Sequence, residues 1–184
     1  MGKLTARAGG LGDRMYAPTI EEASRTIDNL KHYDTIIIHT AVNNLKSQSA
    51  DQVVNEYENL LRKCVSRPFK KIVLSLPTPS LTKPWNDKIS HFKRIILPRI
   101  PDSENIFVCN NNNFNYYGSP TERFFVDDVH LSEEGTRLLS GNIIHTTFGP
   151  RVKVSHSQPI TVNENKNKMI ASEIASAIMR AFEV

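Results

Sequence analysis

The segment from Phe125 to Gly135 carries the residue types best suited to catalysis in this chain. It reads Phe-Val-Asp-Asp-Val-His-Leu-Ser-Glu-Glu-Gly and places Asp127 and His130 three residues apart. An imidazole can act as a general base near neutral pH, because its unperturbed pKa lies there. A nearby carboxylate can fix its tautomer and stabilise the imidazolium. We therefore predict a catalytic pair, the alternative being a loop carboxylate and a histidine that only supports the following helix.

A second polar segment, His39 to Leu45, follows a β-branched run from Thr35 to Thr40 that is typical of a strand buried on both faces. Asn43 within it is a candidate amide donor, the alternative being a turn residue that bonds its own backbone.

The remaining sequence alternates between strand-like and helix-like patterns. Strands are predicted at 3–7, 35–40, 71–76 and 105–109, and helices at 19–30, from Ser49 to Pro68, around 85–96 and after Ser132. Such alternation implies a parallel sheet with helices on both faces, that is, a three-layer α/β/α fold. Reactive groups in these sheets lie on loops at the carboxyl ends of strands, where both polar segments fall.

Composition and length predict one globular domain. The chain has 184 residues, 39% of them hydrophobic and 23% charged, with a formal net charge of +4. We expect the domain to span residues 1–148, a polar linker to span 149–168, and an amphipathic helix to span 169–184. That helix either docks on the core or is presented to a partner.

No apolar run approaches the roughly 20 residues that a membrane span needs, and no signal-peptide pattern precedes the first strand. With two cysteines that we interpret as reduced thiols, we expect an intracellular protein without a membrane span. No His, Cys and carboxylate cluster has the spacing of a metal site, so we expect no metal and no cofactor.

The order of the two polar segments resembles the SGNH-hydrolase superfamily, the GDSL-type esterases and lipases, over roughly residues 3 to 145. The resemblance implies a flavodoxin-like fold, with Asp127 and His130 on the family's Asp-x-x-His pair. Asn43 falls on the oxyanion Asn, and Gly10, in the run Gly9-Gly10-Leu11-Gly12, on the oxyanion Gly. The layout is especially similar to esterase-like domains of LINE-type retrotransposons.

Three positions depart from the family pattern. Ala41 stands where the family has Gly, and Asn44 where it has Asp. Ala41 is costly only if that backbone needs a positive φ. No Gly-Asp-Ser occurs, and Gly12-Asp13-Arg14 has Arg at the nucleophile position. We therefore expect the family's first strand and its serine nucleophile to be missing.

A missing first strand has a structural consequence. The 3–7 strand would lack a neighbour, and the 35–40 strand would expose an apolar edge. We therefore expect a fragment of a longer product that begins at an internal or misassigned Met1. The alternative is a partner that supplies the missing strand.

The resemblance implies hydrolysis of a small ester, in which His130 deprotonates a serine, Asp127 orients His130, and Asn43 with a Gly stabilises the oxyanion. For the chain as given we expect negligible turnover. The alternatives are a non-catalytic module that binds nucleic acid or protein, for which the mild basicity speaks, and a decayed remnant without function.

Overall fold

Five strands form the central sheet of the computed structural model, in the order β2-β1-β3-β4-β5. The structure describes residues 3–7, 13–30, 32–116 and 119–149. The sheet strands are β1 (Lys3–Arg7), β2 (Asp13–Tyr16), β3 (Thr35–His39), β4 (Lys71–Ser75) and β5 (Ile106–Cys109). The α-helices are α1 (Ile20–Ile27), α2 (Val42–Ser47), α3 (Ala50–Val65), α4 (Lys83–Ile96) and α5 (Glu133–Phe148). Short 3-10 turns are η1 (Leu97–Arg99), η2 (Asn112–Phe114) and η3 (Glu122–Phe124), and a small hairpin joins β6 (Asn115–Tyr116) and β7 (Ser119–Pro120).

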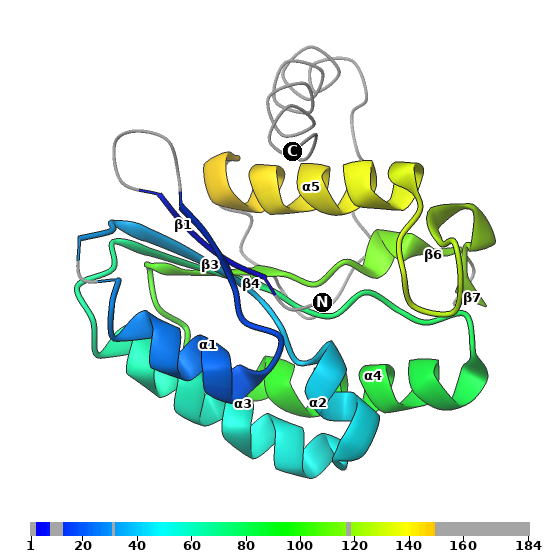
Figure 1. Cartoon of the computed structure of the whole chain (residues 1–184), viewed down its shortest axis with the longest axis horizontal. Coiled ribbons are helices and arrows are strands. Elements are labelled where there is room, and N and C mark those ends of the chain that lie inside the picture. Colours follow the sequence, from blue (N-terminus) through cyan, green and yellow to red (C-terminus); the bar gives the residue numbers. More distant parts are fainter. Residues whose placement is uncertain (1–2, 8–12, 31, 117–118, 150–184) are drawn as a thin grey trace.

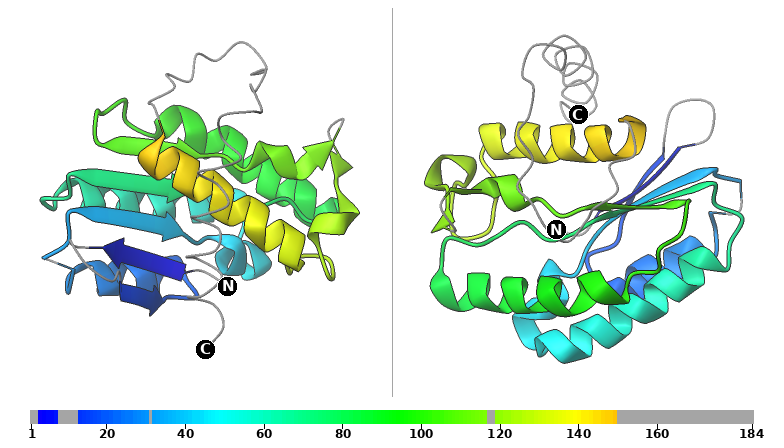
Figure 2. Two further views of the ribbon diagram at one scale, coloured as in Figure 1. Left: turned by 90° about the horizontal axis from the view of Figure 1, so that it is seen from above. Right: turned by 180° about the vertical axis from the view of Figure 1, so that it is seen from behind.

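Helices lie on both faces of the sheet, as the alternating pattern predicts. Helices α1, α2, α3 and α4 cover one face and α5 lies across the other (Figures 1 and 2). The three-layer α/β/α prediction is confirmed, and these layers place the carboxyl ends of β3, β4 and β5 along one edge.

Strands β3, β4 and β5 are parallel, with Ile36 opposite Ile72 and Ile72 opposite Ile106. All three isoleucines are buried, which suits branched side chains on a pleated surface. Helix α3 buries an apolar stripe against the sheet and its neighbouring helices. Tyr57 from this stripe packs edge-on against Phe92 of α4, with ring centroids 5.6 Å apart.

Capping boxes at Thr19 and Ser49 begin α1 and α3, at the starts that the sequence predicts for these two helices. Helix α1 ends at Ile27, short of the predicted Leu30, because Asn29 and Leu30 donate to carbonyls three residues back and so form tighter turns.

Strand β1 corrects two sequence-based expectations. It has neighbours on both sides, because it pairs antiparallel with β2 and with β3, and β3 therefore has no open edge. β1 takes the place of the first strand in the flavodoxin-like order 2-1-3-4-5 but runs in the opposite direction. The sheet is therefore mixed and not parallel throughout. Because β1 covers the edge of β3, an open edge no longer supports the expectation of a fragment.

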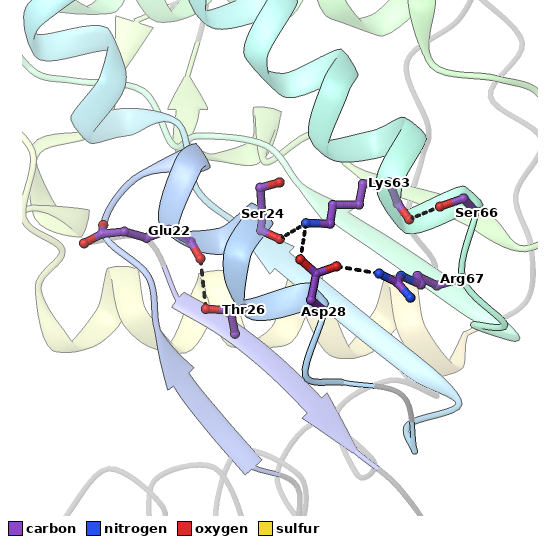
Figure 3. Close-up of polar contacts among 7 residues, drawn as sticks. All are labelled: Glu22, Ser24, Thr26, Asp28, Lys63, Ser66 and Arg67. Carbon is purple, nitrogen blue, oxygen red and sulfur yellow. Dashed lines mark hydrogen bonds and ion pairs between the residues drawn. The ribbon is translucent and has the colours of Figure 1, made fainter.

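The carboxyl ends of α1 and α3 are joined by a charged cluster (Figure 3). Lys63 Nζ donates to Asp28 Oδ2 and to the Ser24 carbonyl, each at 2.6 Å, and Arg67 donates to Asp28 Oδ1. The hydrogen bond from Lys63 is the main reason why the pKa of Asp28 lies below its usual range. Lys63 near the end of α3 also complements the negative end of the helix dipole.

Candidate functional site

The Asp127–His130 pair lies on a tight turn between η3 and α5. His130 Nδ1 lies 2.6 Å from Asp127 Oδ2, and Asp127 Oδ1 accepts from the backbone N–H groups of His130 (2.7 Å) and Val129 (2.9 Å). The carboxylate thus organises the turn and contacts the imidazole at the same time. The predicted pair is therefore brought together.

The flanking backbone closes the turn at its base. Val126 N donates to the His130 carbonyl at 2.9 Å, and Phe125 pairs with Leu131 in an antiparallel bridge. Ser132 then caps α5, as the sequence predicts, by accepting from the N–H of Gly135 at 3.1 Å. The Asp127–His130 pair (the dyad) lies on the turn at residues 126–130 (the dyad turn). Both are consequently fixed to the start of a helix.

A second, small apolar core packs next to the turn. Phe114 is fully buried between Phe124 and Phe125, with its ring centroid 5.4 Å from that of Phe124. Leu81 and Leu131 pack against this cluster. The two phenylalanines adjoin the turn in sequence, so their burial limits its movement.

The electrostatics of the pair suit a general base. The backbone N–H of Val129, followed by the N–H and the ring of His130, lowers the pKa of Asp127 to about 2. Because the ionised carboxylate faces Nδ1, the hydrogen of a neutral imidazole is assigned to Nδ1, and Nε2 keeps a free lone pair. The side chains of His130 and Asp127 are 57% and 54% exposed, so the pair is accessible from solvent.

The Ala41–Asn44 segment lies at the carboxyl end of β3, where α2 begins in place of the predicted loop. Ala41 precedes α2 with φ at 89° and is fully buried. This left-handed backbone is the condition under which the Gly-to-Ala departure carries a cost. The segment is therefore strained at the position where the resembled family has Gly.

Asn43 is half-buried, and its Nδ2 donates to the Pro18 carbonyl at 2.9 Å. That bond runs to the loop before α1 and not to Asp127 or His130. An amide nitrogen carries two hydrogens, so one remains for another acceptor. The oxyanion role of Asn43 stays a prediction.

Asn44 fixes this segment from the buried side. Its Oδ1 accepts from the N–H of Ile20 at 3.0 Å, and its Nδ2 donates to Glu56 Oε2 at 2.8 Å. The amide thereby uses both its acceptor and its donor between α1 and α3. An Asp at this position would keep the first contact and lose the second.

Gly10 and its assigned oxyanion role lie outside the described residues, as do Gly9 and Gly12. The described neighbours of this run are Arg7, opposite Thr35 at the amino end of β3, and Asp13, opposite Ala6. Asp13 begins β2 and does not end a strand, so its setting differs from that of a nucleophile in a strand-to-helix turn. The prediction that Gly12-Asp13-Arg14 is not a nucleophile motif is compatible with this placement.

The sequence did not reveal three supporting residues. Ser80 is fully buried and bonds the dyad turn, and a Cβ on Gly135 would lie 2.0 Å from the Phe124 carbonyl oxygen. Asn111 is buried in a left-handed conformation and donates to the Leu76 carbonyl at 2.6 Å. Asn tolerates that conformation, which is the one signal that could have singled it out.

Within the described ranges, no group of three or more His, Cys, Asp or Glu side chains could hold a metal ion. In the same part of the chain no helix has the length and apolarity needed to cross a bilayer. The predicted linker beyond Gly149 and the predicted helix at 169–184 lie outside the described residues. Binding of nucleic acid or protein stays a prediction.

The fold is shared with two solved structures. A structure described as a platelet activating factor from Streptococcus pneumonia superposes with a TM-score of 0.57 at 16% identity, over 67% of this chain and 65% of the other. A member of the lipolytic protein G-D-S-L family from Veillonella parvula superposes with a TM-score of 0.57 at 11% identity, over 70% of this chain and 74% of the other. Neither a family model nor a curated protein matches the sequence.

These likenesses show the fold alone, a three-layer α/β/α arrangement that this chain shares with a member of the lipolytic G-D-S-L family. The chain spans 65% of the length of the streptococcal structure.

Proposed function

We propose that this chain is an SGNH-type esterase-like domain with a preformed general base, Asp127–His130, and with negligible ester turnover of its own. The observation that carries the proposal is the 2.6 Å contact between His130 Nδ1 and an Asp127 carboxylate that also accepts two backbone N–H groups. The similarity to esterase-like domains of retrotransposons belongs to the same proposal.

Each residue has a definite part in the ester hydrolysis from which such a site would derive. Nε2 of His130 would take the proton of an attacking hydroxyl, while Asp127 holds the Nδ1 hydrogen and stabilises the imidazolium. The remaining amide hydrogen of Asn43 would donate to the oxyanion. The alcohol would leave with the proton returned from Nε2 to its oxygen, and the acyl group would stay on the attacking hydroxyl. Water, deprotonated by the same imidazole, would then release the acid.

A serine nucleophile is the part that the sequence does not supply in the family's motif. Water would then have to attack directly. The dyad is more than half exposed, and a site open to bulk solvent neither orients one water molecule nor strengthens its electrostatics by excluding others. Low turnover is the expected consequence.

The test is hydrolysis of p-nitrophenyl acetate by the purified chain, by His130→Ala and by His145→Ala. His145 is exposed on α5 and serves as the matched control for the weak, nonspecific reactivity of any surface imidazole. We expect the three rates to agree within error. A fluorophosphonate probe, which labels activated serines, should leave the mass of the chain unchanged.

A burst of p-nitrophenol, or turnover that His130→Ala abolishes and His145→Ala preserves, would contradict the inactivity. A covalent fluorophosphonate adduct would identify the nucleophile that the sequence does not show.

A further inference from the structure

The middle of the dyad turn is bonded to a loop that follows a different strand. The Asp128 carbonyl accepts from Ser80 Oγ at 2.8 Å and from the N–H of Leu81 at 3.0 Å. Ser80 and Leu81 belong to the connection between β4 and α4, some 48 residues earlier in the chain. This contact joins the turn to the end of a central strand.

Ser80 is fully buried, and its hydroxyl is completely used. Oγ donates its single hydrogen to Asp128 and accepts from the N–H of Thr82 at 3.2 Å, with Thr82 Oγ1 a further 3.1 Å neighbour. Because that hydrogen is engaged by a carbonyl, Ser80 is not placed as a nucleophile. Its chemistry in this position is that of a fixed donor.

The peptide between Asp128 and Val129 links Ser80 to the catalytic carboxylate. A peptide unit is planar, so holding the Asp128 carbonyl also fixes the direction of the Val129 N–H. That N–H donates to Asp127 Oδ1 at 2.9 Å. One rigid unit is thus held by Ser80 and Leu81 on its carbonyl side and by Asp127 on its amide side.

Among the described residues, the hydrogen bonds of the Asp127 carboxylate run to Val129 and His130 and are therefore local. Local bonds shape the turn but do not fix its orientation relative to the sheet. The contacts from Ser80 and Leu81 to the Asp128 carbonyl do so. The hydroxyl of Ser80 is buried, where a hydrogen bond is stronger than in water.

We propose that Ser80 is a positioning residue for the dyad, which acts by fixing the Asp128–Val129 peptide so that its N–H points at Asp127. This inference rests on the proposed function only in taking Asp127–His130 as the site.

The test is the NMR titration of the Asp127 carboxyl in the intact chain and in Ser80→Ala. Val129 makes the largest contribution to the low pKa of Asp127, so loosening its peptide should raise that pKa from about 2 by about half a unit or more. Ser75→Ala is the matched control, because Ser75 is also fully buried but its Oγ contacts His39 and Asn111. The control should lose stability and leave the titration of Asp127 unchanged.

Ser80→Thr keeps the hydroxyl and should return the pKa of Asp127 to about 2. An unchanged titration in Ser80→Ala would overturn the proposal. So would an equal rise in the alanine and threonine variants, because altered packing and not the lost hydrogen bond would then be the cause. The titration reports on the carboxylate directly, so its outcome is independent of whether the chain hydrolyses esters.

Discussion

The two polar segments at the carboxyl edge of the sheet are built in opposite ways. In the dyad turn, the Asp127 carboxylate has partners within three residues and the backbone is closed by its own bonds. In the segment after β3, Ala41 has a left-handed backbone, and the buried Thr40 hydroxyl has no hydrogen-bond partner in the described structure. Asn43 meanwhile donates to Pro18. The side-chain hydrogen bonds of the base are local, although Ser80 and Leu81 hold its turn from a distance. The segment assigned to the oxyanion depends on distant side-chain contacts.

A strained backbone persists only where its surroundings hold it. Here Asn44 supplies that support by bonding the N–H of Ile20 and the carboxylate of Glu56. The comparison predicts that an added side-chain atom near the dyad turn destabilises it. The segment Ala41–Asn44 should instead be destabilised by changes in the contacts that Asn44 makes with distant residues.

The largest effect is expected from Gly135→Ala, which should break the dyad turn. Its Cβ would lie 2.0 Å from the Phe124 carbonyl oxygen, a backbone atom that cannot move without displacing η3. The free energy of unfolding should fall by about 3 kcal/mol, as measured by urea denaturation.

Gly141→Ala is the matched control on the same helix. An added Cβ there meets nothing within 4 Å, and Ala is the better helix former by about 1 kcal/mol. This variant should gain stability. If the two variants changed the free energy of unfolding equally, α5 would not approach the Phe124 carbonyl as closely as the structure shows.

The dyad turn could be predicted from the sequence because its partners are neighbours. The Asp-x-x-His spacing, the Ser132 cap and the flanking apolar residues all lie within one short segment. The contacts of Ser80 with Asp128 and of Asn44 with Glu56 join residues 48 and 12 positions apart, and no periodicity encodes them. The direction of β1 could not be predicted either. The alternation of side chains identifies a strand but does not show whether it runs parallel or antiparallel to its neighbours.

The second prediction concerns Asn44→Asp, which restores the residue that the SGNH-type pattern has. The new carboxylate would face Glu56 Oε2 at the 2.8 Å position now bridged by an amide hydrogen. Two carboxylates with no donor between them should cost about 2 kcal/mol of unfolding free energy.

Adding Glu56→Gln to the Asn44→Asp variant should recover most of this loss, because the amide of the new glutamine can donate to the carboxylate at position 44. A double variant no more stable than Asn44→Asp would contradict a direct coupling between the two sites.

The smallest effect is expected from Ala41→Gly, and its sign decides whether the left-handed backbone is strained. Glycine removes a cost of about 2 kcal/mol for a left-handed non-glycine residue. It gives up about 0.8 kcal/mol of buried methyl and roughly 0.7 kcal/mol of chain entropy. The net result is a gain of about 0.5 kcal/mol, the difference between these terms, measurable by denaturation.

Ala23→Gly is the control, because Ala23 is equally buried but lies within the ordinary helix α1. It should lose about 1 kcal/mol or more, since the methyl and the helix propensity are removed without relief of strain. A loss of the same size at both positions would place Ala41 in a relaxed backbone and remove the contrast between the two segments.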